Sequence, residues 1–492
     1  MPRLCRSIFA LLAFLAVNSL PASVHSYDLT TLTAADAFTP ERGHGFDLGT
    51  APDASGQPFY FSVAVPEGNW RVTVTFGDPA VASDNTVKAE SRRLMLEHVA
   101  TAPGEFVTRT FIVNVRNRTL PPPLKNAPGG SAVLTNEREE GSFTWDDKLT
   151  LEFNGLAPRV RAIVLEPANV PTIYLLGDST VTDQRWEDGA SWGQMLTRFL
   201  APDIAVANHA ESGETLKSFV TGLRLAKVLS HLRAGDWLFI QFGHNDQKQQ
   251  WPQTYVAAST TYKAWLRTFI AEARLRGATP VLVTSTQRRN FDAQGRIINT
   301  HGGYPQAVRE VAAEEKVALV DLEALSRSLY EVLGPELSPR LFANGGKDAT
   351  HHNNLGAYLL AQCVAKSLRD GGVPLTRYLV TDLPLFDPTH PGNPNDFKLP
   401  ASPLRSTIVP RNWAQRAADD EALNLSDAAI GWGRRFRRVR RSLGRGGGES
   451  PAYKIISPCV LAPLRETPRS IFYSMISRQP WFAGTGIAAS AA

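Results

Sequence analysis

The pattern of hydrophobic and polar positions changes near residue 170 and divides the chain into regions of different secondary structure. From about Tyr27 to Pro167, apolar and polar residues alternate in short runs that are separated by Gly, Pro, Asn and Asp. Alternation with a period of two is typical of strands with one buried face. The strand-like runs are 59–65, 70–76, 106–115, 148–153 and 160–165. They predict a β-sandwich over residues 27–168.

From Thr172 onward, short apolar runs alternate with longer amphipathic stretches. The apolar runs are 173–176, 205–208, 237–241, 280–284 and 318–321, and helical periodicity covers 192–200, 214–232, 255–276, 304–315 and 356–369. This alternation predicts a parallel sheet that is covered by helices on both faces, which is a three-layer α/β/α fold. We place this second domain at residues 169–375, with an extension over 376–404.

The pattern stops after about Pro400, and no strand or helix period is sustained from Trp413 onward. A run rich in arginine, 434–441, is followed by three glycines at 446–448. We expect residues 405–492 to be a basic tail that is disordered or not native to the protein. The alternative for such a run is binding to nucleic acid or to an acidic membrane.

Composition is that of a soluble protein with more than one domain, since the 492 residues are 43% hydrophobic and 20% charged. The net charge of +5 belongs to the tail, where 14 Lys and Arg face 6 Asp and Glu from Arg405 onward. The rest of the chain is slightly acidic, so the basic character lies in the tail, and we do not expect nucleic acid as a partner.

The N-terminus has the features of a secretory signal. Arg3 and Arg6 precede an apolar stretch, 8–20, that is too short to span a bilayer, and 24–26 is a plausible cleavage site. We therefore predict a signal peptide over 1–26 and a secreted or periplasmic protein that keeps no membrane contact after cleavage. An uncleaved membrane anchor is the alternative.

The three cysteines, Cys5, Cys363 and Cys459, predict no structural disulfide. Cys5 leaves with the predicted signal peptide, and Cys459 lies in the tail. Cys363 falls within the last helical pattern, so we interpret it as part of a helix core and not as a nucleophile.

Three polar clusters follow three successive predicted strands of the second domain. They are Gly177-Asp178-Ser179, then Asn208-His209-Ala210 with Gly213, and then Gly243-His244-Asn245-Asp246. In parallel sheets, sites form outside the carboxyl ends of the strands. We therefore expect the three clusters to lie at one edge of the sheet.

These clusters contain the groups that ester hydrolysis by a serine requires, which are a nucleophile, a base and donors for the oxyanion. Ser179 is the candidate nucleophile, with a helix cap as the alternative. Asp348 and His351 are three residues apart, a spacing that lets the carboxylate reach the ring, although a surface turn has the same spacing. Gly213 and Asn245 are the candidate oxyanion donors. A metal site at His351-His352 is disfavoured because no third ligand is near in sequence.

Taken together, the order Ser, Gly, Asn and Asp-x-x-His resembles the GDSL/SGNH hydrolases, and most closely the rhamnogalacturonan acetylesterases, family twelve of the carbohydrate esterases. The resemblance covers about 172–369. It rests on Tyr174-Leu-Leu-Gly-Asp-Ser-Thr-Val-Thr-Asp183, on Asn208-x-Ala210-x-x-Gly213-x-Thr215-x-x-Ser218-Phe219, on Phe242-Gly-His-Asn-Asp246 and on Asp348-x-Thr350-His351-x-Asn353-x-x-Gly356-Ala357.

The resemblance implies a flavodoxin-like catalytic domain that needs no metal and no organic cofactor. It implies that Ser179 is the nucleophile, that His351 is the general base and that Asp348 orients the base. It also implies an oxyanion hole made by the N–H groups of Ser179 and Gly213 and by the Asn245 amide. The G-x-S-x-G elbow of α/β-hydrolases is absent around Ser179.

Three further residues are candidates for substrate binding. Arg288, Arg289 and Tyr304, the last within His301-Gly-Gly-Tyr304-Pro305, also resemble that family. Contact with uronate or hydroxyl groups and a purely structural role are equally compatible with the sequence.

The first domain resembles the sandwich that precedes the catalytic domain in some bacterial members, a galactose-binding-like fold. Tyr60, Trp70 and Trp145 are candidates for stacking on sugar rings, with burial in the sheet core as the alternative.

We therefore expect a serine esterase that removes acetyl groups from pectic polysaccharide, with rhamnogalacturonan as the expected substrate. An esterase for acetylxylan, another glycan or a small ester is the first alternative. A carbohydrate-binding protein with an inactive hydrolase domain is the second.

Overall fold

The computed structural model describes residues 23–53 and 55–402. The predicted tail 405–492, Cys5, Cys459 and the predicted signal peptide apart from residues 23–26 lie outside the described residues. The first strand, β1 (His25–Asp28), includes the last two residues of the predicted signal peptide. His25 and Ser26 pair with β9, so cleavage after Ser26 would remove half of this short strand.

The N-terminal region consists of two antiparallel sheets whose side chains share one hydrophobic core. The four-stranded sheet has the order β1, β9 (Val160–Pro167), β4 (Gly68–Phe76) and β7 (Val107–Val115). The five-stranded sheet has the order β2 (His44–Asp47), β3 (Phe59–Ala64), β8 (Lys148–Leu156), β5 (Ser83–Ala89) and β6 (Arg93–Thr101). Two short 3-10 turns lie in the connections between strands: η1 (Leu29–Thr31) follows β1, and η2 (Glu137–Glu139) lies between β7 and β8.

The second region is built on the parallel five-stranded sheet that the sequence predicts, which confirms the α/β class. Its strands are β10 (Thr172–Gly177), β11 (Ala205–Asn208), β12 (Trp237–Gln241), β13 (Thr279–Val283) and β14 (Ala318–Val320). They lie in the order β11-β10-β12-β13-β14, and every neighbouring pair is parallel. Counted from β10, this order is 2-1-3-4-5, which is that of flavodoxin-like sheets.

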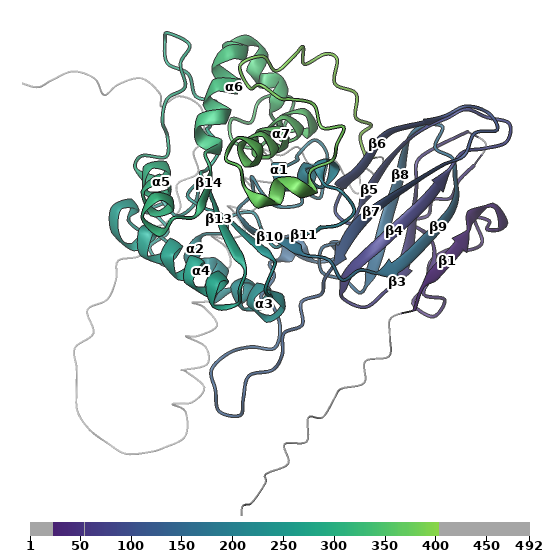
Figure 1. Ribbon diagram of the computed structural model, residues 1–492, viewed down its shortest axis with the longest axis horizontal. Coiled ribbons are helices and arrows are strands. Elements are labelled where there is room, and N and C mark those ends of the chain that lie inside the picture. The colour runs from purple at the N-terminus through teal and green to yellow at the C-terminus, as the bar shows by residue number, and fades with distance from the viewer. Residues whose placement is uncertain (1–22, 54, 403–492) are drawn as a thin grey trace, which may run out of the picture. The chain divides into compact units, whose positions relative to one another are not determined.

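Helices cover both faces of this sheet (Figure 1). One face packs against α1 (Trp192–Met195), η3 (Leu196–Phe199), α6 (Leu322–Leu337), η5 (Ser338–Leu341), α7 (Asn354–Asp370) and η6 (Pro374–Tyr378). The other face packs against α2 (Leu216–Thr221), α3 (Arg224–His231), the π-turn η4 (Ala258–Tyr262), α4 (Lys263–Leu275) and α5 (Tyr304–Glu315).

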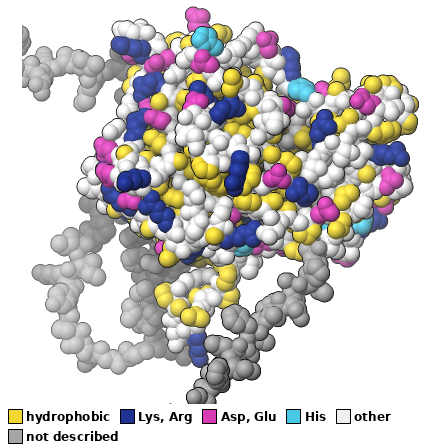
Figure 2. All heavy atoms as spheres, in the orientation of Figure 1, with side chains coloured by type: hydrophobic (Ala, Val, Ile, Leu, Met, Phe, Trp, Pro, Cys, Tyr) yellow, Lys and Arg dark blue, Asp and Glu magenta, His cyan; other side chains and the backbone are white. Residues whose placement is uncertain are grey.

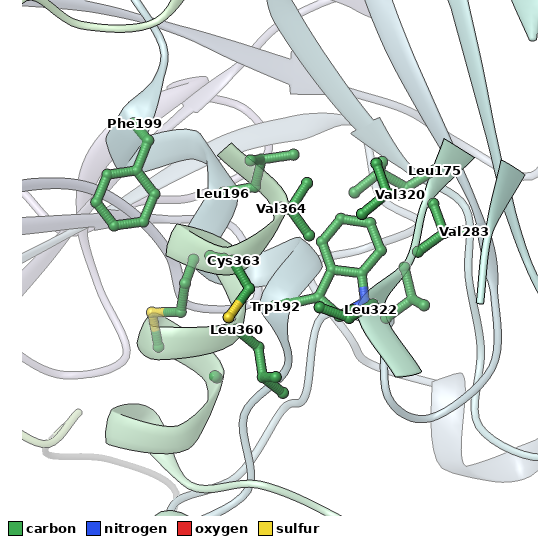
Figure 3. Close-up of a cluster of buried hydrophobic side chains, with 14 of the residues drawn as sticks. Leu175, Trp192, Leu196, Phe199, Val283, Val320, Leu322, Leu360, Cys363 and Val364 are labelled. Atoms are coloured by element: carbon green, nitrogen blue, oxygen red, sulfur yellow. The ribbon is translucent and has the colours of Figure 1, made fainter. Parts of the chain in front are cut away.

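The side chains of strand β10 contribute to two hydrophobic cores, one on each face of the sheet. Ile173 and Leu175 belong to the core beneath α1 and α7, whereas Tyr174 and Leu176 belong to the core beneath α2 and α4, because successive side chains of a strand point to opposite faces. Figure 3 shows the first of these cores, with Trp192 among side chains of β10, β13, β14 and α7. Cys363 lies in the same core, buried and free of any disulfide.

The C-terminal extension, predicted as part of the catalytic domain, also contacts the N-terminal sheets. Lys88 of β5 donates hydrogen bonds to the Pro400 carbonyl and the Ser402 hydroxyl, each at 2.8 Å. Asn154 of β8 donates to the Ala401 carbonyl, also at 2.8 Å. Residues 400–402 therefore form a strap along the five-stranded sheet.

Two observations concern the surface of the described residues. Figure 2 shows basic and acidic side chains interspersed over one face, in line with the near balance of charge outside the tail. Among residues 23–53 and 55–402, no helix combines the length and apolar character that crossing a bilayer requires.

Candidate active site

The loop that carries Ser179 lies between the loops that carry Gly213 and Asn245. This arrangement follows from the sheet order, because β10 is hydrogen-bonded to β11 on one side and to β12 on the other. All three loops leave the carboxyl ends of parallel strands, where sites in such sheets form. The three polar clusters therefore share one edge, as expected from the sequence.

The turn around Ser179 is fixed by its neighbours. The buried Asp178 carboxylate accepts hydrogen bonds from the backbone N–H and the hydroxyl of Thr180, at 3.0 and 2.9 Å. Gln184 donates to the Ser179 carbonyl at 2.7 Å. A Cβ added at Gly177 would lie 2.5 Å from a Val181 methyl group, so only glycine lets the strand turn so tightly here.

His351 connects Ser179 to Asp348. Its Nε2 lies 2.9 Å from Ser179 Oγ, and its Nδ1 lies 2.9 Å from Asp348 Oδ2. Both contacts have hydrogen-bond length, so the three side chains form one continuous chain. This is the geometry that lets an imidazole take a serine proton while a carboxylate fixes its tautomer.

The Asp348 carboxylate is held in its charged form. Partial burial raises its pKa, but hydrogen bonds from the His351 ring and from the backbone amides of His351 and Thr350 outweigh that effect and lower it to about 2. The two amides donate to Oδ1 at 2.8 and 2.6 Å, which leaves Oδ2 for the ring. This turn directly precedes α7, whose N-terminus is capped by Asn353.

Gly213 and Asn245 lie on two loops that are tied together. Gly213 has a φ of +83°, in the left-handed region that favours glycine. The Asn245 amide donates to the Glu214 carbonyl at 3.1 Å. Asp246 accepts from the backbone N–H of Leu216 and of Gly243, both at 2.9 Å, and burial raises its pKa to about 7.

Arg288 contacts two buried histidines, His244 and His301. It donates to Thr300 Oγ1 at 3.1 Å and to the His244 carbonyl at 3.4 Å, and its Nη1 lies 3.3 Å from His301 Nε2. The rings of His244 and His301 are joined at 2.8 Å. Burial lowers the pKa of His301 to about 3, with the Arg288 charge as a second cause, so this ring is neutral at pH 7.

Arg289 and Tyr304 also have partners within the protein. Arg289 donates to the Gly346 carbonyl at 2.8 Å and lies over the Phe342 ring. The Tyr304 hydroxyl donates to the Val256 carbonyl at 2.5 Å, and its side chain is buried. These contacts fit the purely structural role that was one of the two interpretations of the sequence. Substrate contact by Arg288, Arg289 and Tyr304 stays a prediction.

The aromatic candidates of the N-terminal region are also engaged in the fold. Tyr60 and Trp70 are 4% and 2% exposed, which matches the buried alternative. Trp145 is half-buried, donates to Glu139 at 2.9 Å and carries Arg116 over its ring.

Sequence reasoning missed the residues that support the site from the N-terminal region. Arg93 of β6 lies 3.2 Å from Asp183 Oδ2, and Asp183 accepts from Asn208 at 2.8 Å. Arg138 pairs with Glu211. These arginines follow no local motif, and only the long-range fold brings them to the site.

His352, the residue after the candidate base, is packed in the hydrophobic core. The His352 ring is buried and lies 2.6 Å from the Tyr330 hydroxyl. Within the part of the chain that the structure describes, no group of three or more His, Cys, Asp or Glu side chains is arranged to hold a metal ion.

Known proteins are similar in sequence to the region that contains this site. A sequence model of the GDSL-like Lipase/Acylhydrolase family matches residues 175–359. The chain is 40% identical over 222 residues to rhamnogalacturonan acetylesterase RhgT of Bacillus subtilis, which covers 42% of this chain and 94% of that protein. It is 38% identical over 215 residues to the probable rhamnogalacturonan acetylesterase YesY of the same organism, covering 43% of this chain and 98% of that protein.

The chain also has a likeness among solved structures. The crystal structure of protein YXIM of Bacillus subtilis is 24% identical and covers 72% of this chain and 99% of its own, with a TM-score of 0.41.

Proposed function

Because the chain belongs to the GDSL-like acylhydrolases, and among them to the rhamnogalacturonan acetylesterase family, we propose that it removes acetyl groups from rhamnogalacturonan. The observation that carries the proposal is the chain of contacts from Ser179 through His351 to Asp348, in a domain 40% identical to an enzyme of that name. The protein is a carboxylic ester hydrolase by family.

The reaction begins when Ser179 Oγ attacks the acetyl carbonyl carbon and His351 Nε2 takes the hydroxyl proton. Asp348 holds the ring through Nδ1 and stabilises the imidazolium that forms. The carbonyl oxygen becomes an oxyanion, which accepts hydrogen bonds from the N–H groups of Ser179 and Gly213 and from the Asn245 amide. Each such donor contributes about 2.7–4 kcal/mol to the barrier reduction in serine hydrolases.

The tetrahedral intermediate then collapses. The bond to the sugar oxygen breaks, and His351 returns its proton to that oxygen, so that a free sugar hydroxyl leaves. A water molecule attacks the acetyl group on Ser179, again with His351 as base. Acetate departs and the Ser179 hydroxyl is restored. No step requires a metal or an organic cofactor.

The substrate assignment is tested by measuring acetate release from acetylated rhamnogalacturonan and acetylated xylan side by side. We expect a higher kcat/KM on rhamnogalacturonan. A clear preference for xylan would contradict the pectin assignment and favour the acetylxylan alternative. No hydrolysis of either polymer or of an aryl acetate would favour a carbohydrate-binding protein with an inactive hydrolase domain.

For the N-terminal region, we propose that its two antiparallel sheets form a β-sandwich of the galactose-binding type over 27–168. Support comes from the single core that both sheets share and from the short connection between the end of β9 at Pro167 and the start of β10 at Thr172. The catalytic domain then spans 169–375, and 376–404 is its extension.

We also propose that the protein is exported, since its N-terminus has the pattern of a signal peptide and a polysaccharide substrate lies outside the cytoplasm. The mass of the protein recovered from culture medium or periplasm tests this proposal. A mature N-terminus near Tyr27 is expected, and a full-length product that stays with the membrane would contradict it. Retention on DNA that vanishes with the arginine run would instead indicate a nucleic-acid role for the tail.

A further inference from the structure

The loop that carries Gly213 is held by a side chain from the N-terminal region. Arg138, in the 3-10 turn η2, donates from Nε to Glu211 Oε1 at 3.2 Å and from Nη2 to the Ser212 carbonyl. A Cβ built on Gly213 would lie 3.4 Å from Arg138 Nη2. The guanidinium therefore packs directly beside the glycine whose N–H is a proposed oxyanion donor.

The neighbouring residue, Glu139, holds the other end of the same loop. Its carboxylate accepts a hydrogen bond from Arg224 Nη2, and Arg224 Nε lies 3.2 Å from Glu214 Oε1. Glu139 also accepts from the Trp145 indole at 2.9 Å. Two consecutive residues of η2 thus hold positions on both sides of Gly213.

The second oxyanion donor depends on the same loop. The Asn245 amide donates to the Glu214 carbonyl at 3.1 Å, so its orientation follows the position of Glu214. A glycine at φ +83° has wide conformational freedom of its own, and a donor must be fixed before the reaction to stabilise an oxyanion. The contacts from η2 supply that restraint.

Loss of the Arg138 side chain leaves the buried charges of the loop paired. Glu211 also accepts a hydrogen bond from Arg185 at 2.9 Å. Burial raises the pKa of Glu211, but the charges of Arg185, Arg138 and Arg224 more than offset this and hold it below its ordinary value. The Arg138 side chain is 37% exposed, in contrast to the buried Arg93, Arg116 and Arg224. The fold is therefore expected to survive substitution at Arg138.

We propose that Arg138 is a positioning residue of the oxyanion hole, and hence that the N-terminal region completes the active site. The inference rests on the proposed esterase function. It assigns to this region a role in the chemical step, separate from any binding of sugar.

The test is steady-state hydrolysis of an aryl acetate by the full-length chain with R138A, R138K and the control R118A. Arg118 lies in the same segment between β7 and β8, and its side chain donates a hydrogen bond to Thr135 Oγ1 at 2.9 Å. For R138A we expect kcat to fall about tenfold with KM changed less than about twofold, because the donors are displaced but not removed. R138K should recover part of the loss, since its ammonium group reaches the Ser212 carbonyl, and R118A should match the wild type.

Equal kcat values for R138A and the wild type would overturn the proposal, as would equal losses in R138A and R118A. Thermal unfolding of each variant shows whether a loss reflects unfolded protein. If R138A does not fold, R138M replaces it, because methionine keeps the apolar stem without donors. Equal activity of R138M and R138K would then overturn the proposal. If the wild type itself hydrolyses no ester, the proposed function fails, and that outcome is distinct from the failure of Arg138 alone.

Discussion

At the scale of single residues, the Asp-x-x-His spacing occurs twice in the described chain. Asp387 and His390 form the same contact as Asp348 and His351, with Oδ2 and Nδ1 2.9 Å apart in both pairs. The His390 side chain is 84% exposed, whereas His351 reaches Ser179. The spacing therefore predicts a carboxylate–imidazole pair, and only the fold decides which pair meets a nucleophile.

The second pair provides a matched control for the first. In D348N the amide donates to His351 Nδ1 and favours the wrong tautomer, so we expect kcat on an aryl acetate to fall by about 10³- to 10⁴-fold with little change in KM. D387N should match the wild type in both constants. Equal activity of D348N and D387N would show that Asp348 does not orient the base.

The same substitution has a predicted pH dependence of stability. The pKa of Asp348 is lowered from 3.8 to about 2 in the folded protein, so its stabilising effect is present above about pH 4 and is lost as pH falls through 2. The free energy of unfolding of D348N should be lower than that of the wild type by on the order of 2 kcal/mol at pH 7. Denaturant unfolding should show that the difference in free energy of unfolding between the two proteins becomes smaller near pH 2. A difference that does not change with pH would contradict the lowered pKa of Asp348.

At the scale of elements, regular patterns predicted the structure well and interrupted patterns did not. The predicted helix 214–232 is two helices, because Leu223 takes a left-handed φ of 60° between α2 and α3. Helix α6 was missed, since Gly334 and Pro335 near its end indicate a turn. Strands β5 and β6 were missed because buried charged residues, among them Lys88 and Arg93, replace the usual apolar alternation.

At the end of strand β10, the close packing around Gly177 predicts that a larger side chain there lowers stability and activity. In G177A the added methyl group meets Val181 at 2.5 Å and the Gln241 carbonyl at 2.8 Å, which displaces the turn that carries Ser179. We expect a loss of about 1–3 kcal/mol in stability and a fall in kcat of at least about tenfold. G303A is the control, since its methyl group would lie at an ordinary 3.6 Å from Ala258. Wild-type kcat in G177A would show that the turn tolerates a side chain.

At the scale of the whole molecule, contacts between distant segments join the N-terminal sheets to the catalytic region. Arg93 reaches Asp183, Arg138 reaches Glu211 and Lys88 reaches the strap at 400–402. The four sequence blocks that contain the site residues could be predicted through family resemblance, but these contacts could not. The two residues of each contact are 73 to 312 residues apart in the sequence, and isolated charged residues follow no period.

The contacts of the strap at 400–402 indicate how far the chain can be shortened from its C-terminus. A chain that ends at residue 404 keeps the hydrogen bonds from Lys88 and Asn154, and we expect wild-type activity and an unchanged thermal midpoint. A chain that ends at 378 leaves the buried Lys88 ammonium without these acceptors, so its midpoint should be lower by several degrees. Equal midpoints for the two shortened chains would contradict a stabilising role for the strap, and loss of activity at 404 would contradict a dispensable tail.

The central claim is that Ser179 is the nucleophile of a polysaccharide acetylesterase, and one measurement tests it most directly. Acetate release from acetylated rhamnogalacturonan is followed for the wild type and for S179A at equal concentrations, with circular dichroism to confirm that both are folded. We expect steady release by the wild type and a rate at least about 10⁴-fold lower for S179A, since the remaining groups cannot form the acetyl-enzyme. Equal rates for the two folded proteins would contradict it.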